Sequence, residues 1–375
     1  MNFLQSVQLI FNVGVIVLQN GQGLYQINSK ICYVACCIIW TALGFVLGQI
    51  RTLQKFGWIA NLAVWINLSV MILTMTIVSH HSPNYTASKA SNGRGADYGP
   101  IATYVGTPPY SEGFETGISG LMQAVYSYGG TLIFCEFLSE MRRPTDFWKS
   151  LLVAQSFIFV VYLFFGIFVY SYHGEFVINP AFQGLSSQVA LKAGNILGLT
   201  AALIAAALYS NIGIKVMYAN IGVELLGAPS LDRKSGKLLW VALVPVYWSA
   251  AFILAAAIPN FSNLSGLVAA VCILQFTYTF PPLLMLGCDI QLHAMRDDEG
   301  FNEETGQTVR IDKGWKRWAR GARKYWYVNV WNLLFCMGAL ATAALGMYSS
   351  IEGLRKAFET GRSTSFGCKG PLGSG

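Results

Sequence analysis

The sequence is short of charged side chains. Only 11% of its 375 residues are Asp, Glu, Lys or Arg, while 54% are hydrophobic. A soluble domain carries about 25% charged residues, because a surface that faces water has to be polar. The shortage therefore excludes an ordinary soluble fold and indicates a protein whose surface lies mostly in lipid. The 10 Trp and 18 Tyr residues are typical of proteins that place aromatic rings at membrane interfaces.

Residues for metal or covalent chemistry are also scarce. The chain has four His and eight Cys residues, and no two Cys have the two-residue separation typical of a zinc site. We therefore expect no metal and no organic cofactor, and we expect the cysteines to be free thiols packed as small apolar side chains. No acid–base pair, nucleophile constellation or phosphate loop is recognisable, which argues against an enzyme. No long basic face is present for a nucleic acid.

Long hydrophobic runs fill most of the chain. A bilayer-spanning helix needs about 20 mostly apolar residues, and about nine runs qualify, near 1–19, 31–48, 57–78, 117–138, 150–172, 190–218, 238–258, 264–287 and 325–348. The sequence therefore predicts an all-α membrane protein whose transmembrane domain covers residues 1–350. The polar tail from 351 to 375 is expected to be disordered.

The loops between these runs differ in basic residues. With Met1 on the inside, the inside loops hold most of the 25 Lys and Arg residues. The positive-inside rule then places the N-terminus in the cytoplasm and the C-terminus outside the cell or in a lumen. Asn84 begins an Asn-Tyr-Thr triplet in an outside loop and is the expected N-glycosylation site. The plasma membrane and the vacuolar membrane both remain open as locations.

The fourth run is interrupted by a pair of glycines. Ser127 and Tyr128 precede Gly129 and Gly130, and Thr131 follows. Paired glycines weaken a helix and let the backbone leave helical geometry. In a membrane, a broken helix is tolerated where it lines a cavity and offers backbone groups to a ligand. Close helix packing is the alternative use of small residues, but the flanking hydroxyls favour a substrate-binding site made of these five residues.

Three more polar residues are candidates for the same region. Glu136 is an acid at membrane depth, and such groups are usually functional. Its expected role is proton coupling or gating, with a structural pairing to Arg142 as the alternative. Asn12 in the first run and Asn195 in the sixth are expected to bind substrate from the facing helices.

Other features are expected to be structural. The aromatic run from Tyr162 to Tyr170 is expected to face lipid or to pack against other helices. Pro281 and Pro282 should bend or end the eighth helix, because proline cannot donate a backbone hydrogen bond. The inner loop near 288–324 is expected to be solvated, with partner binding as the alternative.

Several of these stretches resemble the amino acid/auxin permease family, and its fungal amino acid permeases most closely. The resemblance extends from Met1 to about Ser350 and rests on the stretches 48–53, 128–144, 165–170, 211–216, 258–259 and 265–268. It implies the amino acid–polyamine–organocation transporter fold, which has inverted repeats, about eleven spans and a substrate site at broken helices. By this resemblance the fourth run corresponds to the family's sixth span, and Tyr128–Thr131 falls at its substrate-binding break.

The resemblance implies a secondary active transporter of neutral amino acids that works by alternating access. Its coupling ion would be a proton, with sodium as the alternative. Its partners would be an amino acid and the lipid bilayer, and protein partners are not indicated. The chain begins at what resembles the family's third span, so the first two transmembrane helices are expected to be missing. That departure keeps two other functions open, a non-transporting sensor or regulatory membrane protein and an inactive fragment of a transporter.

Overall fold

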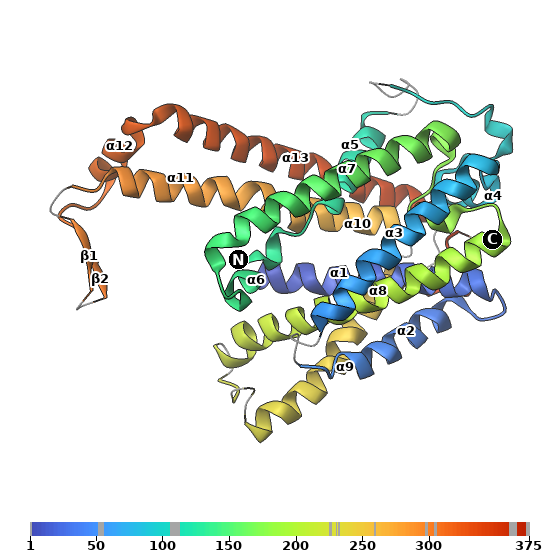
Figure 1. Ribbon diagram of the computed structural model, residues 1–375, viewed down its shortest axis with the longest axis horizontal. Coiled ribbons are helices and arrows are strands. Elements are labelled where there is room, and N and C mark those ends of the chain that lie inside the picture. The colour runs from blue at the N-terminus through green and yellow to red at the C-terminus, as the bar shows by residue number, and fades with distance from the viewer. Residues whose placement is uncertain are drawn as a thin grey trace.

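The computed structural model describes residues 2–51, 56–105, 113–224, 227–229, 231, 233–258, 260–296, 299–303, 306–359 and 366–372. Within these ranges the chain forms an elongated helical bundle (Figure 1). In the part of the chain that the structure describes, seven helical segments are long and apolar enough to cross a membrane. They are α1 (Asn2–Ile27), α3 (Phe56–His80), α7 (Phe147–His173), α8 (Gln188–Met217), α9 (Lys234–Ala257), the segment from α10 (Phe261–Val268) to α11 (Phe280–His293), and α13 (Trp326–Glu359).

Two predicted spans take other forms, so the count of nine is not confirmed. The second predicted span is α2 (Tyr33–Leu47), an apolar helix of 15 residues. The fourth is divided into α5 (Gly113–Ser127), the 3₁₀ turn η3 (Thr131–Ile133) and α6 (Phe134–Glu140). A further 3₁₀ turn, η4 (Pro144–Asp146), then leads into α7.

The centre of the bundle is α1, which packs against α2, α8, α9 and α10. Close packing is possible because small residues lie at the helix contacts. A Cβ atom at Gly21 would overlap Sγ of Cys37, and one at Gly44 would overlap the indole ring of Trp248. These glycines therefore bring α1 against α2, and α2 against α9.

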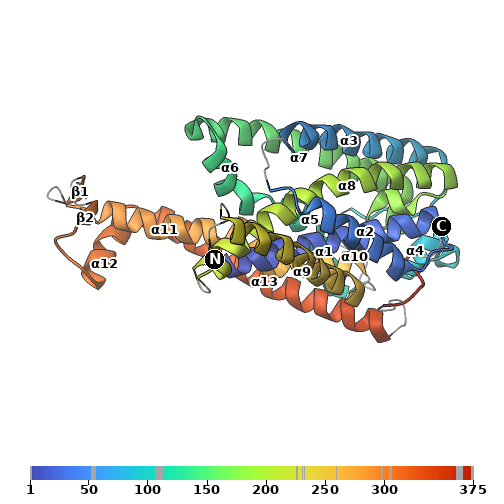
Figure 2. The same cartoon turned by 90° about the horizontal axis from the view of Figure 1, so that it is seen from below.

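One flank of the bundle consists of α3 and α7, which lie side by side (Figure 2). Their outward side chains are large and apolar, as at Trp58, Trp65, Leu152 and Val160, all of which are well exposed. Exposed apolar surface on this scale is unfavourable in water and suits contact with lipid tails. The two helices therefore form a membrane-facing layer over the centre.

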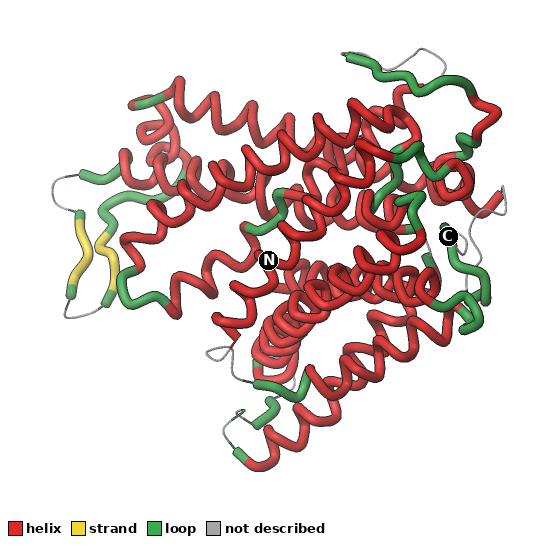
Figure 3. The backbone as a smooth tube through the Cα atoms, turned by 45° about the vertical axis from the view of Figure 1, so that its right-hand side comes forward, coloured by secondary structure: helices red, strands yellow, loops and turns green. Residues whose placement is uncertain are grey.

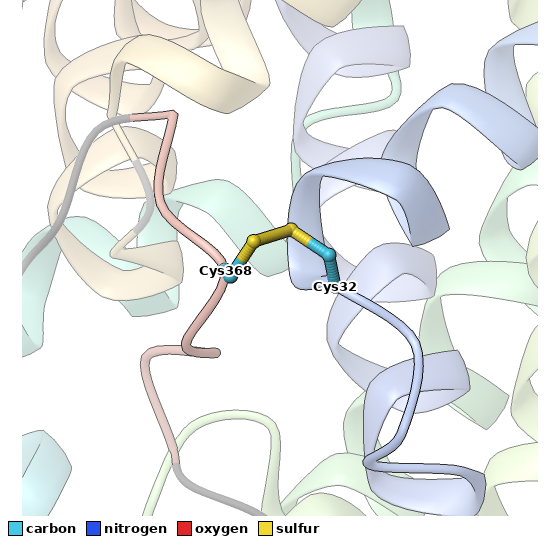
Figure 4. The surroundings of a disulfide bond; sticks show 2 residues. All are labelled: Cys32 and Cys368. Atoms are coloured by element: carbon cyan, nitrogen blue, oxygen red, sulfur yellow. A yellow bond between two sulfur atoms is a disulfide. The ribbon is translucent and has the colours of Figure 1, made fainter.

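The end of the bundle that holds the C-terminus is covered by short elements. They are α4 (Tyr85–Asn92), η1 (Ala96–Tyr98), η5 (Gly174–Phe176) and η6 (Ala181–Gly184). Here Cys32, just before α2, forms a disulfide with Cys368, which lies 336 residues later (Figure 4). The expectation that all cysteines are free is therefore wrong for this pair, and six others are free thiols.

Much of the tail beyond residue 350 also has a defined place. The last helix, α13, continues to Glu359. Farther on, the N–H of Phe366 donates to the carbonyl of Ala256 (3.2 Å), and the N–H of Tyr33 donates to the carbonyl of Cys368 (3.1 Å). The tail was expected to be disordered, and the structure differs in residues 351–359 and 366–372 because a helix and a cross-link position them.

At the opposite end, α11 extends past the other helices and carries a small folded extension. It comprises the antiparallel strands β1 (Gly300–Asn302) and β2 (Gln307–Val309), drawn in yellow in Figure 3, and then α12 (Trp315–Lys324). Inside it, Nη1 of Arg317 lies 2.7 Å from a carboxylate oxygen of Glu299, and both side chains are almost fully buried. Arg320 pairs with Asp312 at 2.7 Å. The region expected to be a solvated loop is therefore held together by an ion-pair network.

Between α10 and α11 the chain forms two π-helical segments, η8 (Ala269–Ile273) and η9 (Gln275–Thr279). Pro281 and Pro282 follow at the first positions of α11. The helix does not end there, because the helical segment runs from Phe261 to His293. A third π-helical segment, η7 (Tyr218–Val223), ends α8.

Candidate functional site

The break in the fourth predicted span lies at the residues that the glycine pair indicated. The helix α5 ends at Ser127, and helical geometry resumes at Thr131. Between them the N–H of Gly129 donates to Tyr126 and the N–H of Gly130 donates to Tyr128, each in a tight turn. The prediction of a broken helix is confirmed, and its cause is the low helix propensity of adjacent glycines.

The break leaves backbone groups without partners. Among the hydrogen bonds of the described residues, none reaches the carbonyl oxygen of Gly129 or the N–H of Thr131. A polar backbone group away from water is costly unless it is satisfied. These two groups are therefore available to a ligand with a donor and an acceptor.

A cavity of about 1010 Å³ lies beside the break. It is lined by α1, α3, α5, α7, α8, the 177–182 segment and the end of η8. Five predicted site residues line it, namely Asn12, Ser127, Tyr128, Gly129 and Gly130. The structure thus brings the break together with the polar residue of α1 that the sequence suggested.

The other predicted site residues lie elsewhere or cannot be placed. Thr131 starts η3 and is not part of the cavity lining. Asn195 is fully buried outside the lining, where its Nδ2 donates to Oε1 of Gln26 (3.0 Å) and its Oδ1 faces Nε2 of Gln183 (3.4 Å). These bonds connect α8 with α1 and η6, which gives Asn195 a structural role in this geometry. Glu136 lies in α6, and its side chain falls outside the described part of the structure.

Two cavity walls were missed by sequence reasoning. Polar residues of α3 and α7 face the cavity, among them Asn67, Thr74, Gln155 and Tyr162. Polar side chains within apolar helices were the signal that could have found them. The rings of Tyr128 and Tyr162 meet edge to face, with centroids 5.7 Å apart. Tyr162, expected to face lipid or pack, thus belongs to the site.

Gln123 connects the outer part of the broken helix to its neighbours. Its Oε1 accepts hydrogen bonds from Nδ2 of Asn179 and Oγ of Ser265, both at 2.9 Å. Its Nε2 donates to the carbonyl of Ser262 at 2.8 Å. Since Gln123, Asn179 and Ser262 also line the cavity, this junction fixes the cavity wall just before the break.

The cavity is polar but uncharged. Each residue that lines it in the described part of the chain is neither acidic nor basic. Asn12 is only 7% exposed, and its Oδ1 has no hydrogen-bond partner among the described residues. A buried amide oxygen without a partner costs about 1–3 kcal/mol. Asn12 is therefore prepared to accept a hydrogen bond from a bound donor.

Asn84, the predicted glycosylation site, caps α4. Its side-chain oxygen accepts from the N–H of Ala87 (3.1 Å), and its Nδ2 donates to the carbonyl of Leu185 (3.3 Å). Because Nδ2 is the atom that would carry a glycan, modification would replace the bond to Leu185. Glycosylation at Asn84 stays a prediction.

Comparison with known proteins adds the family context. Residues 1–290 match the family model described as transmembrane amino acid transporter protein. A transmembrane transporter of Fusarium pseudograminearum is 24% identical over 88% of this chain, and one of Gibberella moniliformis is 25% identical over 74%. The N amino acid transport system protein of Neurospora crassa is 21% identical over 66% of the chain. No solved structure matches.

The aligned part is only a portion of each relative. This chain covers 62%, 56% and 46% of the lengths of these three proteins, respectively. The chain therefore spans about half the length of the curated relatives it matches.

Proposed function

Since the chain belongs to the family of transmembrane amino acid transporter proteins, we propose that it moves amino acids across a membrane by secondary active transport. The protein is an integral multi-pass membrane protein, as its seven candidate spans indicate. The observation that carries the proposal is the broken helix at Tyr128–Gly130, whose residues line a cavity. Broken helices beside a cavity are the usual substrate sites of secondary transporters.

The break offers groups that suit both ends of an amino acid. An α-carboxylate accepts hydrogen bonds, and the N–H of Thr131, which directly follows the cavity-lining Gly130, donates to no other described residue. An α-ammonium group donates, and both the carbonyl of Gly129 and Oδ1 of Asn12 lack donors. The substrate would thus bridge the break and α1. Tyr128, held against Tyr162, would contact its side chain and act as a gate.

The charge of the cavity supports a proposal about the class of substrate. A cationic or anionic substrate side chain would lose its hydration without gaining an opposite charge, because the described lining is uncharged. We therefore propose neutral amino acids. Coupling to a proton, with sodium as the alternative, would use Glu136, an acid six residues beyond Gly130 in the chain.

The disulfide supports an orientation in the membrane. Disulfides persist in oxidising compartments and are rare in the cytosol, so the end with Cys32 and Cys368 would face the cell exterior or a lumen. The opposite end, with the N-terminus and α12, would then be cytoplasmic, in agreement with the positive-inside rule. A C-terminal epitope tag should be inaccessible to antibody added from the cytoplasmic side. Access from that side would reverse the orientation.

Uptake into cells tests the proposal. Cells that express the full chain at a verified membrane level should accumulate a labelled neutral amino acid, and more so at acidic than at neutral pH. Glu136→Gln should remove the pH dependence, whereas Asp146→Asn at a surface ion pair should preserve it. Binding without accumulation would indicate a sensor instead. The proposal would be contradicted if well-folded protein neither bound nor took up the amino acid.

A further inference from the structure

A second pocket lies at the end of the molecule that holds the N-terminus, separate from the cavity at the break. Its volume is about 580 Å³, and it lies between the segment after α2, the last part of α8 and the first turns of α9. Three of its lining residues are cations, one from each of these segments. They are Arg51, Lys215 and Lys237.

These three cations have no acidic counterpart in the described part of the chain. None of the described ion pairs includes Arg51, Lys215 or Lys237, and no carboxylate lines the pocket there. Like charges that converge on one concavity repel one another, and the repulsion falls when an anion enters. The electrostatics of the pocket therefore favour an anionic occupant.

The wall of the pocket is firmly held. Trp240 is almost completely buried, and its indole N–H donates to the carbonyl of Gly48 at 3.2 Å. The amide Nδ2 of Asn211 donates to the carbonyl of Ile50. These bonds fix the segment that carries Arg51 against α8 and α9. The cations thus project from a fixed frame, unlike lysines scattered on a mobile surface.

The surroundings indicate where the anion comes from. Beside the pocket, Val46 on α2 and Leu238 and Val241 on α9 are exposed by 70%, 73% and 53%. Exposed aliphatic side chains on membrane helices face lipid tails. A basic pocket between helix ends next to such a surface is the arrangement that binds phosphate-bearing lipid headgroups, with the acyl chains lying along the apolar strip.

We propose that Arg51, Lys215 and Lys237 form a binding site for a phosphate-bearing anion, supplied by an anionic phospholipid of the surrounding leaflet. Arg51 supplies a planar donor fork for phosphate oxygens, and the two lysines add point charges. Bound there, the headgroup joins α2, α8 and α9. The site does not depend on amino acid transport, so the two proposals fail or succeed separately.

The test measures lipid binding to the purified full chain. Nanodiscs of phosphatidylcholine are compared with nanodiscs that also contain phosphatidic acid, by thermal unfolding and by native mass spectrometry of retained lipid. The test variant carries Arg51→Gln, Lys215→Gln and Lys237→Gln. The matched control carries Lys192→Gln, Arg323→Gln and Lys324→Gln, which remove the same charge from exposed positions elsewhere. Single Lys215→Gln and Lys237→Gln variants replace the triple variant where it fails to fold.

Phosphatidic acid should raise the Tm of the parent and of the control. In the test variant its affinity should fall on the order of 100-fold, since each cation near an anionic lipid surface contributes roughly a factor of five. Inorganic phosphate, added to protein in neutral detergent, distinguishes the sources. If inorganic phosphate raises the Tm of the parent as much as phosphatidic acid does, a soluble anion is the ligand of the same site. Equal binding of phosphatidic acid by test and control variants, or no binding of either anion, would overturn the proposal.

Discussion

Two membrane helices of this protein have an irregular middle, but only one of them breaks there. After α5, three residues leave helical geometry before η3 begins. Between α10 and α11, the chain stays helical from Phe261 to His293 through two π-helical segments. The difference shows that adjacent glycines open a helix where adjacent prolines do not. Pro281 and Pro282 stand in the first turn of α11, directly after the π-helical segment η9.

The two interruptions also touch. A Cβ atom at Gly129 would lie 2.7 Å from Cγ2 of Ile273, the last residue of η8. π-helical turns are frequent at functional sites, and here one shapes the surface on which the broken helix rests. The broken helix exposes backbone groups, while the continuous helix supplies the support behind them.

The largest expected effect comes from filling the contact between the two helices. Gly129→Ala should reduce uptake at least about tenfold, because overpacking at a tight contact costs about 1–3 kcal/mol and displaces the break. Gly130→Ala is the matched control, since its nearest neighbour would be Cε1 of Phe134 at 4.0 Å. Both variants are compared by the uptake of a labelled amino acid into cells in which the membrane level of the protein has been verified.

A second substitution tests whether the contact itself is the cause. Ile273→Ala removes the atoms that a Cβ at position 129 would meet. Combined with Gly129→Ala, it should restore much of the uptake that Gly129→Ala alone removes. Equal losses for Gly129→Ala and Gly130→Ala, or no recovery in the double variant, would show that the two helices do not act on each other in this way.

A smaller effect is expected from the ring contact at the break. Edge-to-face aromatic pairs contribute about 0.5–1.5 kcal/mol, so Tyr128→Ala should raise the KM for uptake by about two- to tenfold. Tyr128→Phe should stay close to the parent because it keeps the ring. Tyr162→Ala should match Tyr128→Ala, and the double variant should add little. Fully additive effects would contradict a shared contact.

At the far end of the continuous helix, the expected effect is local and depends on pH. The hydrogen bond from Arg317 lowers the pKa of Glu299 below its ordinary value of 4.5, and the hydrogen bond from Arg320 lowers that of Asp312 to about 2. A lowered pKa means that the ionised pair stabilises the folded segment above the ordinary pKa. That stabilisation is lost as the pH falls through the folded value. Hydrogen-exchange protection of residues 299–312 should therefore decrease in acid.

Glu299→Gln provides the control for this segment. It should lower the protection already at neutral pH and remove the part of the acid dependence that belongs to Glu299. Uptake should change little, because the segment lies beyond the end of α11, and none of its residues lines the cavity in the described part of the chain (Figure 1). If the segment of the parent protein were as well protected in acid as at neutral pH, the result would contradict the role of the ion pairs.

The smallest effect is expected at the proline pair. Pro281→Ala should change uptake by less than about twofold and stability by within about 1 kcal/mol, because the helix is already continuous there. Uptake and Tm measure both quantities. A large loss would mean that the prolines, like the glycines, shape a functional interruption.

The break could be predicted from the sequence because its cause is local. Adjacent glycines with polar neighbours inside an apolar run are visible without the fold, and Tyr128–Gly130 do line the cavity. The family was also recognisable, since the resemblance was spread over many segments and the family model covers residues 1–290. Helix positions followed the hydrophobic runs, as α8 shows by spanning Gln188–Met217.

What escaped prediction depends on contacts between distant residues. Cys32 and Cys368 are 336 residues apart, and nothing local pairs them. Nothing in the sequence around Asn195 indicated that Gln26 and Gln183 would form its hydrogen bonds. Tyr162 lines the cavity because of the way α7 packs against α3, which the sequence does not show. Pro281 and Pro282 do not end their helix, and the π-helical turns before them could not be predicted because packing sets them and no recognisable pattern marks them.

The most direct test of the central claim asks whether substrate occupies the break. In a background with Cys135→Ser and Cys288→Ser, which removes the two exposed thiols, Gly130→Cys introduces a thiol where a Cβ has room beside the cavity. The account predicts that a saturating neutral amino acid slows labelling at position 130 by a small thiol reagent, whereas a charged amino acid does not. An unchanged labelling rate in protein that still takes up the amino acid would place the substrate elsewhere.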